Sequence, residues 1–346
     1  MVSKSTTTAC NYAESANHAK NARRRRNRNE ENSIRCAPWR RPSGRGGSPQ
    51  RRRSGAIDAA GSAAGADPGE QSTTTQFWDG RSPDLEDQAL HPFINPVEHG
   101  LKNHDPILKI VRKDPEYKKA FQEVFGKKGK EITMREVTLA IAAFERTVIS
   151  GDSPFDRYYF GGEEDDLTEQ QKRGFDLFLN EGRCVSCHVI EQTQALFTDN
   201  RFHNIGVGIN NIQNDVPKLA GNFLQADMTV SEVDVEVLTD ARTSELGRFA
   251  ISHGFDDLGS FKTPTLRNIA VTSPYMHDGS IETLKDVVIH YNNGGVTDVG
   301  DPVNDFLSGG IRALDLDEDQ IDDLVAFMEA LTSPEFEPSA DEADGQ

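Results

Sequence analysis

Residues 182–188, GRCVSCH, constrain this chain more than any other part of its sequence. Two cysteines separated by two residues can bind zinc or take part in thiol redox chemistry. When a histidine follows directly, the two thiols can instead capture the vinyl groups of haem, and the imidazole becomes the proximal iron ligand. The motif therefore predicts covalent haem c at Cys184, Cys187 and His188, with a zinc site as the alternative.

Charge is spread unevenly along the 346 residues. The formal net charge is −18, but residues 1–70 hold 14 Lys and Arg against 6 Asp and Glu, so the remainder carries −26. Nucleic acid binds to basic surfaces, and the acidic part of the chain excludes that partner. An acidic surface serves solubility, or attracts a basic redox partner. No run of 18 apolar residues occurs, so no membrane span is expected.

The first 70 residues differ in composition from the rest. They are rich in Arg, Gly, Ser and Pro and lack apolar periodicity, which predicts a disordered or non-native N-terminal segment. A basic arm that binds nucleic acid is an alternative. The first 30 residues also lack the apolar core of a signal peptide, although haem c is attached outside the cytoplasm. A wrongly assigned start would explain both observations.

Apolar residues recur at helical spacing in much of the remaining sequence, and strand signals are few. We expect a mainly α fold, with helices within the segments 82–93, 114–126, 133–150, 167–180, 280–295 and 317–333. Residues 152–166 are interpreted as a linker because they contain Asp, Pro and Gly. Residues 207–258 are polar and poorly periodic, and they predict a long loop or insertion.

Several further blocks occur in the order found in bacterial di-haem cytochrome c peroxidases and their MauG-like relatives. These blocks lie within about residues 76–332 and read FWDGRSPDLEDQAL, NPVEHG, AFERTVISGDSPFDRY, RFHNIGV, FKTPTLRNIAVTSPYMHDGS and LKDVVIHYNNGG. The chain resembles this family. The resemblance implies cytochrome c-like haem domains, a periplasmic or otherwise extracytoplasmic location, and haem c as the cofactor.

Members of that family carry two such domains, each with a CxxCH motif. Hydrogen peroxide is cleaved at the N-terminal haem, and the C-terminal haem relays electrons. This sequence has one CxxCH motif, in the C-terminal position. We therefore expect residues 71–160 to be an incomplete first cytochrome c domain, residues 161–335 the C-terminal domain, and residues 336–346 an acidic tail.

The second axial ligand of the haem has two candidates. Met276 is a soft thioether that would raise the reduction potential, and Tyr291 is a phenol that would favour ferric iron. Chemistry alone mildly favours the methionine. The resemblance implies Tyr291 instead, because the peroxidases carry methionine and the MauG-like enzymes carry tyrosine at its position. A buried tyrosine with a hydrogen-bonded hydroxyl is the structural alternative.

The resemblance also implies roles for three residues near the start of the matched region. Trp78 corresponds to the tryptophan that lies between the two haems and supports electron transfer. Glu98 corresponds to the acid beside the peroxidatic haem, where a carboxylate can move a proton between peroxide oxygens. Gln88 corresponds to a second polar residue of that pocket. From composition alone, Trp78 would be interpreted as a packing residue.

Two further sites are implied. Thr272 and Pro274 match positions whose backbone carbonyls bind calcium in the family, and such oxygen ligands suit calcium. The third protein ligand falls in the replaced N-terminal segment, so at most a partial calcium site is expected. Arg267 is a candidate partner for a haem propionate, since guanidinium binds carboxylates well. A structural arginine is the alternative.

These observations lead to a hypothesis about function. The chain is expected to be a haem c oxidoreductase that reduces hydrogen peroxide, provided that the native protein holds the N-terminal haem. Electrons would come from a cytochrome c, a cupredoxin or a protein substrate. The alternatives are a mono-haem electron-transfer protein without peroxidase activity and a non-catalytic haem-binding module.

Overall fold

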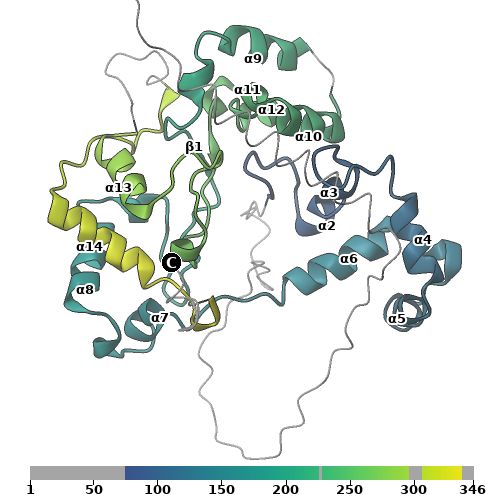
Figure 1. Ribbon diagram of the computed structural model, residues 1–346, viewed down its shortest axis with the longest axis horizontal. Coiled ribbons are helices and arrows are strands. Elements are labelled where there is room, and N and C mark those ends of the chain that lie inside the picture. Colours follow the sequence, from purple (N-terminus) through teal and green to yellow (C-terminus); the bar gives the residue numbers. More distant parts are fainter. Residues whose placement is uncertain (1–74, 226–227, 296–305, 337–346) are drawn as a thin grey trace, which may run out of the picture. The chain divides into compact units, whose positions relative to one another are not determined.

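The computed structural model describes residues 75–225, 228–295 and 306–336, and these are mostly helical (Figure 1). The mainly α fold class is confirmed. In this described part the only sheet pairs two short antiparallel strands, β1 (Phe202–His203) and β2 (Phe261–Lys262). The expected N-terminal segment and acidic tail lie outside the described residues, apart from residue 336. No helix among the described residues has the length and apolar character needed to cross a membrane.

The first group of helices has its own small core. It consists of α2 (Leu85–Gln88), α3 (His91–Ile94), α4 (Asp105–Lys113), α5 (Pro115–Phe125), the 3-10 turn η1 (Gly129–Glu131) and α6 (Met134–Glu145). Helix α5 ends where the sequence predicts, because Gly126 adopts the left-handed conformation at φ +68°. Phe121 and Ile132 are buried between these elements. The first helix begins at Leu85 with Asp84 as its N-cap.

The interpretation of residues 152–166 as a linker is wrong. They form α7 (Pro154–Tyr159) and the 3-10 turn η2 (Glu164–Asp166), and Ser153 caps α7 by accepting a hydrogen bond from the Asp156 amide. Phe155 is fully buried and its ring contacts Phe175, Phe197 and Phe327. The Asp, Pro and Gly residues of this segment mark the ends of a short core helix, so composition alone misled.

The prediction of a long loop or insertion at residues 207–258 is also wrong. This segment contains η4 (Ile209–Ile212), α9 (Val216–Gln225), α10 (Val230–Thr239), α11 (Ala241–Ser244), α12 (Phe249–Ser252) and η5 (Phe255–Asp257). Its buried apolar residues, among them Phe223, Val237, Leu246 and Phe249, form a separate core. The helices are short, so few apolar positions repeat within each one, and periodicity did not reveal them.

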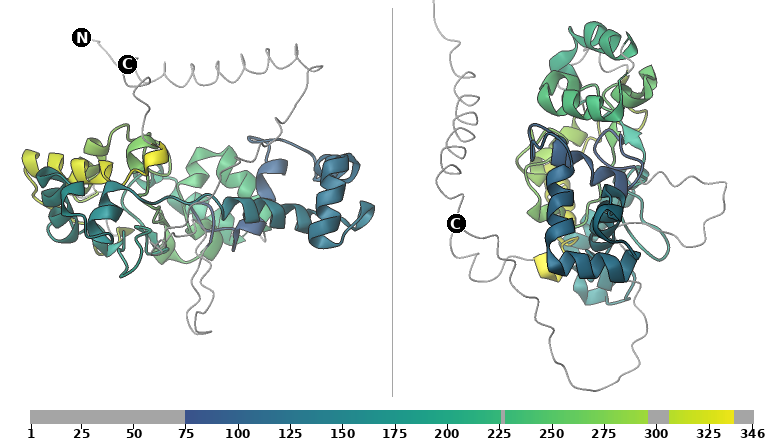
Figure 2. Two further views of the ribbon diagram at one scale, coloured as in Figure 1. Left: turned by 90° about the horizontal axis from the view of Figure 1, so that it is seen from below. Right: turned by 90° about the vertical axis from the view of Figure 1, so that its right-hand side faces the viewer.

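The largest core surrounds the CxxCH motif. It is built by α8 (Glu169–Leu179), η3 (Cys184–Ser186), η6 (Ile269–Val271), α13 (Leu284–Asn292) and α14 (Glu318–Glu329), with η8 (Pro334–Phe336) after the last helix. Helices α8 and α14 lie side by side (Figures 1 and 2). Gly174 allows this approach, because a Cβ atom there would lie 1.9 Å from the carbonyl oxygen of Asp323.

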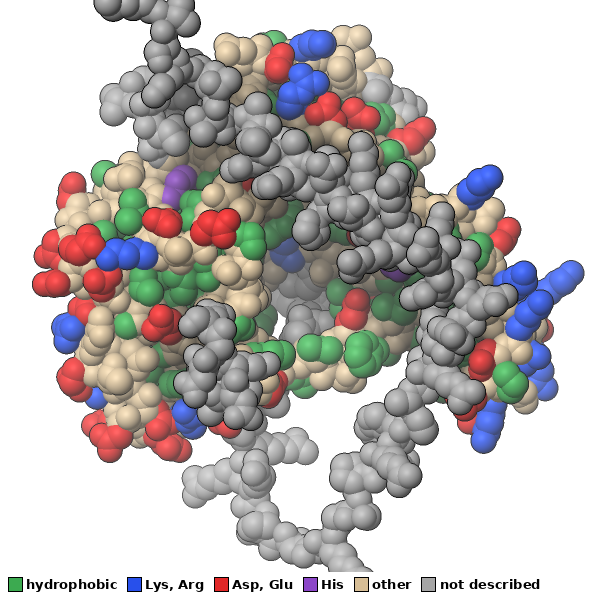
Figure 3. Space-filling view, in the orientation of Figure 1, with side chains coloured by type: hydrophobic (Ala, Val, Ile, Leu, Met, Phe, Trp, Pro, Cys, Tyr) green, Lys and Arg blue, Asp and Glu red, His purple; other side chains and the backbone are tan. Residues whose placement is uncertain are grey.

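Charged side chains gather by sign on the face seen in Figure 3. Lys and Arg side chains cluster over α4 and α5, where Lys109, Lys113, Lys118 and Lys119 are exposed. Acidic side chains dominate the face over α8 and α14. On this face, acidic side chains therefore gather over the part of the chain around the CxxCH motif.

Candidate haem site

The CxxCH motif forms one tight turn directly after α8. The Gly182 amide donates to the Leu177 carbonyl at 2.8 Å, and the His188 amide donates to the Cys184 carbonyl at 2.9 Å. Gly182 is required here, since a Cβ atom would lie 2.8 Å from that same Leu177 oxygen. The turn brings Cys184, Cys187 and His188 to the wall of one cavity.

This cavity has a volume of about 360 Å³ and a mainly apolar wall. Its apolar lining comes from α8, α13, α14 and the segment before η6, and includes Phe178, Leu266, Leu284, Val288, Leu324 and Met328. An apolar cavity with a few polar groups at defined places is typical of a cofactor site. A porphyrin, whose faces are apolar, is compatible with such a wall.

His188 is held in the orientation that a metal ligand needs. Its Nδ1 lies 2.8 Å from the carbonyl oxygen of Phe197, so the N–H there donates and Nε2 remains available. Burial lowers the pKa of His188, because the imidazolium form loses its hydration. The side chain is therefore neutral at physiological pH, the form that coordinates iron.

The two cysteines are free thiols in the structure. Burial raises the pKa of Cys184 to about 12, which keeps this thiol protonated. Zinc requires thiolates and, in structural sites, four ligands. Among the described residues the potential ligand atoms that come together here belong to Cys187, Asp199 and His203, without Cys184. No group of potential ligand atoms among the described residues joins both cysteines, and this favours the haem interpretation of the motif over zinc.

Both candidates for the second axial ligand line the same cavity. Tyr291 lies in the last turn of α13, and burial raises the pKa of its phenol. Met276 follows Tyr275 with a positive φ of 71°. Next to it, His277 stacks on Phe261 with ring centroids 3.5 Å apart. Because both Met276 and Tyr291 reach the cavity wall, the choice between them as the second axial ligand stays a prediction.

The cavity brings together some of the predicted site residues and leaves out others. Trp78, Thr272 and Pro274 also line it. Gln88 is the last residue of α2 and Glu98 is exposed in the turn after α3, and neither lines this cavity. The resemblance assigns those two residues to the other haem, so their distance from His188 does not test their role.

Arg267 lies in the core beside the cavity rather than on its wall. Its Nη2 donates to Asp156 Oδ1 at 2.8 Å, its Nη1 bonds the other carboxylate oxygen, and its Nε donates to the Ala195 carbonyl at 2.8 Å. These contacts occupy the guanidinium. The environment of Arg267 fits a structural arginine, which is the alternative that the sequence left open.

Sequence reasoning missed Arg183. This residue lines the cavity, and its buried Nη1 has no hydrogen-bond partner within the described ranges. Arg183 is half-buried, and a guanidinium nitrogen without a partner next to a cofactor cavity is a natural partner for a carboxylate of the cofactor. Its position immediately before Cys184 is the sequence feature that could have identified it as a residue of the haem site. Lys262 and Arg312 are two further cations on the same wall.

A CxxCH turn, a neutral oriented histidine and an apolar cavity define a c-type haem protein. Comparison with known proteins is more specific. The family model described as di-haem cytochrome c peroxidase matches residues 2–165. The chain is 34% identical to the methylamine utilization protein MauG of Methylorubrum extorquens over 263 residues, which cover 76% of this chain and 61% of that protein.

A second relative is matched over more of its length. MauG of Paracoccus denitrificans is 30% identical over 291 residues, covering 78% of this chain and 70% of the relative. Among solved structures, a MauG-like protein associated with microbial copper homeostasis is similar with a TM-score of 0.57 and 29% identity, covering 78% of this chain and 75% of that one.

The chain belongs to the di-haem cytochrome c peroxidase and MauG family. Haem c is the cofactor of this family, and the residues around the CxxCH turn fit it. The chain spans less than two thirds of the Methylorubrum relative, and the matched family region includes residues 2–74, which the structure does not describe.

Proposed function

We propose that this chain is a haem c oxidoreductase that reduces hydrogen peroxide with electrons relayed through the haem at His188. The observation that carries the proposal is the single cavity wall shared by Cys184, Cys187, His188 and Tyr291. Family membership supports the reaction type. Bound haem c supplies a one-electron centre, and an iron with an open position supplies peroxide chemistry.

Each residue of the site has a proposed role. Cys184 and Cys187 anchor the haem as thioethers, and His188 ligates the iron through Nε2. Tyr291 is the second ligand, and Arg183 pairs with a propionate. Thr272 and Pro274, both exposed, offer carbonyl oxygens to a calcium ion.

Trp78, Glu98 and Gln88 have proposed roles at or near the second haem. Trp78, on the cavity wall, carries electrons between the haem at His188 and a second haem held by the N-terminal portion of the native protein. The exposed Glu98 carboxylate moves a proton between peroxide oxygens, and Gln88 hydrogen-bonds the oxidant. Residues 71–160 would then belong to the first cytochrome c domain and residues 161–335 to the second.

The proposed setting follows from the cofactor. The protein works in the periplasm or another extracytoplasmic compartment, and a cytochrome c, a cupredoxin or a protein substrate donates the electrons. A tyrosine ligand points to the MauG-like branch, where a protein or other large substrate is oxidised. The acidic face over α8 and α14 suits a basic donor.

A covalent haem count on protein from its native source, with peroxide turnover on the same sample, tests the proposal. Two haems and peroxide-dependent oxidation of a reduced cytochrome are expected. One haem that cycles by single electrons and consumes no peroxide would support the mono-haem electron-transfer alternative. The variant Cys184→Ser/Cys187→Ser controls for adsorbed haem, since it should lose the covalent haem at His188 and keep only the second one.

A further inference from the structure

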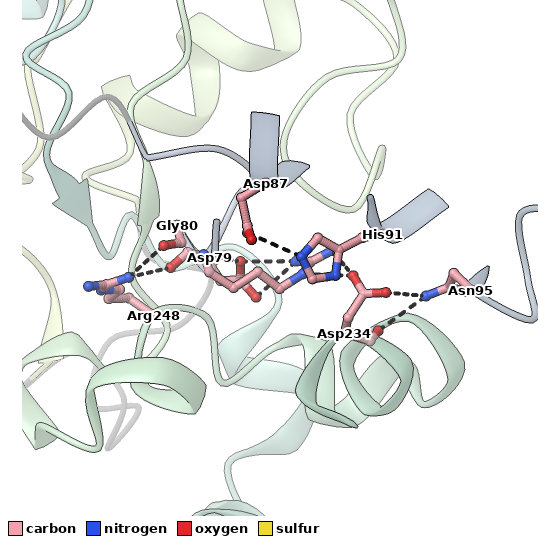
Figure 4. Close-up of polar contacts among 8 residues, drawn as sticks. Asp79, Gly80, Asp87, His91, Asn95, Asp234 and Arg248 are labelled. Atoms are coloured by element: carbon pink, nitrogen blue, oxygen red, sulfur yellow. Dashed lines mark hydrogen bonds and ion pairs between the residues drawn. The ribbon is translucent and has the colours of Figure 1, made fainter. Parts of the chain in front are cut away.

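A buried polar cluster outside the haem cavity joins residues 79–95 to helix α10 (Figure 4). Arg81 lies at its centre. Its Nε donates to Asp234 Oδ1 at 2.8 Å, and its Nη1 donates to the Asp79 carboxylate oxygens at 2.9 and 3.0 Å. Asn95 donates from Nδ2 to the other Asp234 oxygen at 2.7 Å. We call these four residues the Arg81 cluster.

The burial of this cluster is unusual for charged groups. The side chains of Arg81 and Asp234 are 4% and 2% exposed. Removing such ions from water carries a large free-energy cost, which is offset only when the polar atoms are well paired. A hydrophobic contact would join the two segments at lower cost. In some proteins, buried clusters of this kind fix one particular arrangement of neighbouring residues.

The residues that the cluster fixes are the two neighbours of Trp78. The Phe77 ring lies under the Arg81 guanidinium at 3.6 Å and meets the His91 ring edge-on at 5.7 Å. On the other side of Trp78, the Asp79 carboxylate binds the same guanidinium. Arg81 therefore holds the chain on both sides of the tryptophan.

The backbone of the same loop is tied to β2 and to the start of α12. The Lys262 amide donates to the Trp78 carbonyl at 2.7 Å. Arg248 Nη1 donates to the carbonyls of Asp79 and Gly80 at 3.1 and 3.0 Å. Gly80 has a φ of +69°, and a Cβ atom there would lie 2.3 Å from the Phe202 ring. Only glycine permits this approach.

The indole ring of Trp78 is less constrained than the backbone and the two neighbouring residues. Trp78 lines the haem cavity but is 43% exposed, so its own burial fixes it weakly. We propose that Asp234 is a positioning residue, which acts through Arg81 to hold the Trp78 indole at the wall of the haem cavity. Helix α10 contributes to the haem site by this contact without lining the cavity. The proposal rests on the proposed haem site.

Fluorescence of Trp78 tests the proposal directly. The chain has two tryptophans, Trp39 and Trp78, and Trp39→Phe leaves Trp78 as the single emitter. Haem close to an indole quenches its emission, and a fixed indole has high anisotropy and resists acrylamide. In the haem-loaded full chain, Asp234→Asn should cause loss of quenching, lower anisotropy and greater access to acrylamide.

Matched variants separate positioning from general damage. Glu236→Gln lies on the same helix at an exposed position and should leave all three signals unchanged. If Asp234→Asn does not fold, Asn95→Ala removes one bond to Asp234 and should shift the signals in the same direction by less. Circular dichroism confirms that each variant is folded.

The outcomes distinguish this proposal from the haem assignment. Equal covalent haem in parent and variant, with unchanged Trp78 signals in the variant, would overturn the positioning role, even if the variant unfolds at a lower temperature. Absence of covalent haem in the parent would instead reject the haem site. Anisotropy and acrylamide access then still decide whether Asp234 fixes the indole.

Discussion

His188 Nδ1 lies 2.8 Å from the carbonyl oxygen of Phe197, whose ring is fully buried in the largest core. His188, the proposed proximal ligand, is therefore oriented by a backbone atom that the aromatic core itself holds in place. Because the Nδ1 proton is committed to that carbonyl, Nε2 is the atom that faces a metal. The packing of residues near 197 is thus linked to the chemistry at residue 188.

Exchange of the second axial ligand should move the reduction potential. If Tyr291 ligates the iron, Tyr291→Met should raise the midpoint by on the order of 0.1 V, because a neutral thioether stabilises ferrous iron. A spectroelectrochemical titration measures this shift. Met276→Leu is the control and should leave the midpoint in place. A large change in Met276→Leu with none in Tyr291→Met would reverse the assignment.

Removal of the cation at Arg183 should shift the same potential in the opposite direction. A positive charge near the haem favours the reduced state, so Arg183→Gln should lower the midpoint by less than the Tyr291 exchange raises it. Arg242→Gln, on the exposed surface of α11, is the control for net charge. Equal midpoints for Arg183→Gln and the parent would rule out pairing with a propionate.

Asp156 should contribute stability that acid removes. Burial raises the pKa of Asp156, but hydrogen bonds and charge from Arg267 outweigh it, so the pKa lies below its ordinary value. This stabilisation is present above the ordinary pKa of about 4 and is lost as the pH falls through the lower folded-state value. At pH 7, Asp156→Asn should lower the free energy of unfolding by about 3 kcal/mol, because a buried guanidinium loses its partner.

Urea unfolding at pH 7 and at low pH measures this difference. The gap between parent and Asp156→Asn should narrow in acid. Lys172→Gln, which breaks an exposed pair on α8, should change neither curve measurably. A gap that stays constant with pH would mean that lost packing, rather than charge, explains the effect.

Two helical glycines should respond in opposite ways to the same substitution. Gly174→Ala places a methyl group against the Asp323 carbonyl and should separate α8 from α14, with a clear loss of stability. Gly221→Ala, on α9, meets no atom within 4 Å and should stabilise by about 0.8 kcal/mol through helix propensity. Thermal unfolding compares them, and equal effects would contradict the packing described here.

The aromatic core should be far more sensitive than the exposed aromatic surface. Phe155→Ala should cost about 4 kcal/mol, because it opens a cavity among buried rings. Phe144 is 68% exposed, and Phe144→Ala should change stability by about 0.5 kcal/mol or less. Equilibrium unfolding in urea measures both. A mild effect at Phe155 would show that α7 does not belong to the core.

The sequence carries much of the fold where local signals are strong. Helix α5 could be predicted to its last residue because Gly126 ends it. The CxxCH motif predicted one cofactor site for Cys184, Cys187 and His188, and all three residues line one cavity. Short helices could not be predicted from such local signals. Phe155 stands in a segment with Asp, Pro and Gly, and nothing local indicates that its ring lies in the core.

The site was predictable in part for a related reason. Cys184 and His188 are four residues apart in sequence, so their spacing carries information about their geometry. Arg267 and Asp156 are more than a hundred residues apart, and their pairing arises only from the tertiary fold. The same holds for Arg81 and Asp234, which no local pattern connects.

The pairing of α8 with α14 also has a consequence for the order of assembly. In a chain made from its N-terminus, the CxxCH turn exists long before Leu324 and Met328, which complete the cavity wall. Contacts between segments so far apart in sequence form late in folding. Under the proposed haem assignment, the two thiols would be accessible to incoming haem while that side of the cavity is still open. The last helix would then enclose the attached cofactor, so that maturation and folding of this domain would be completed together.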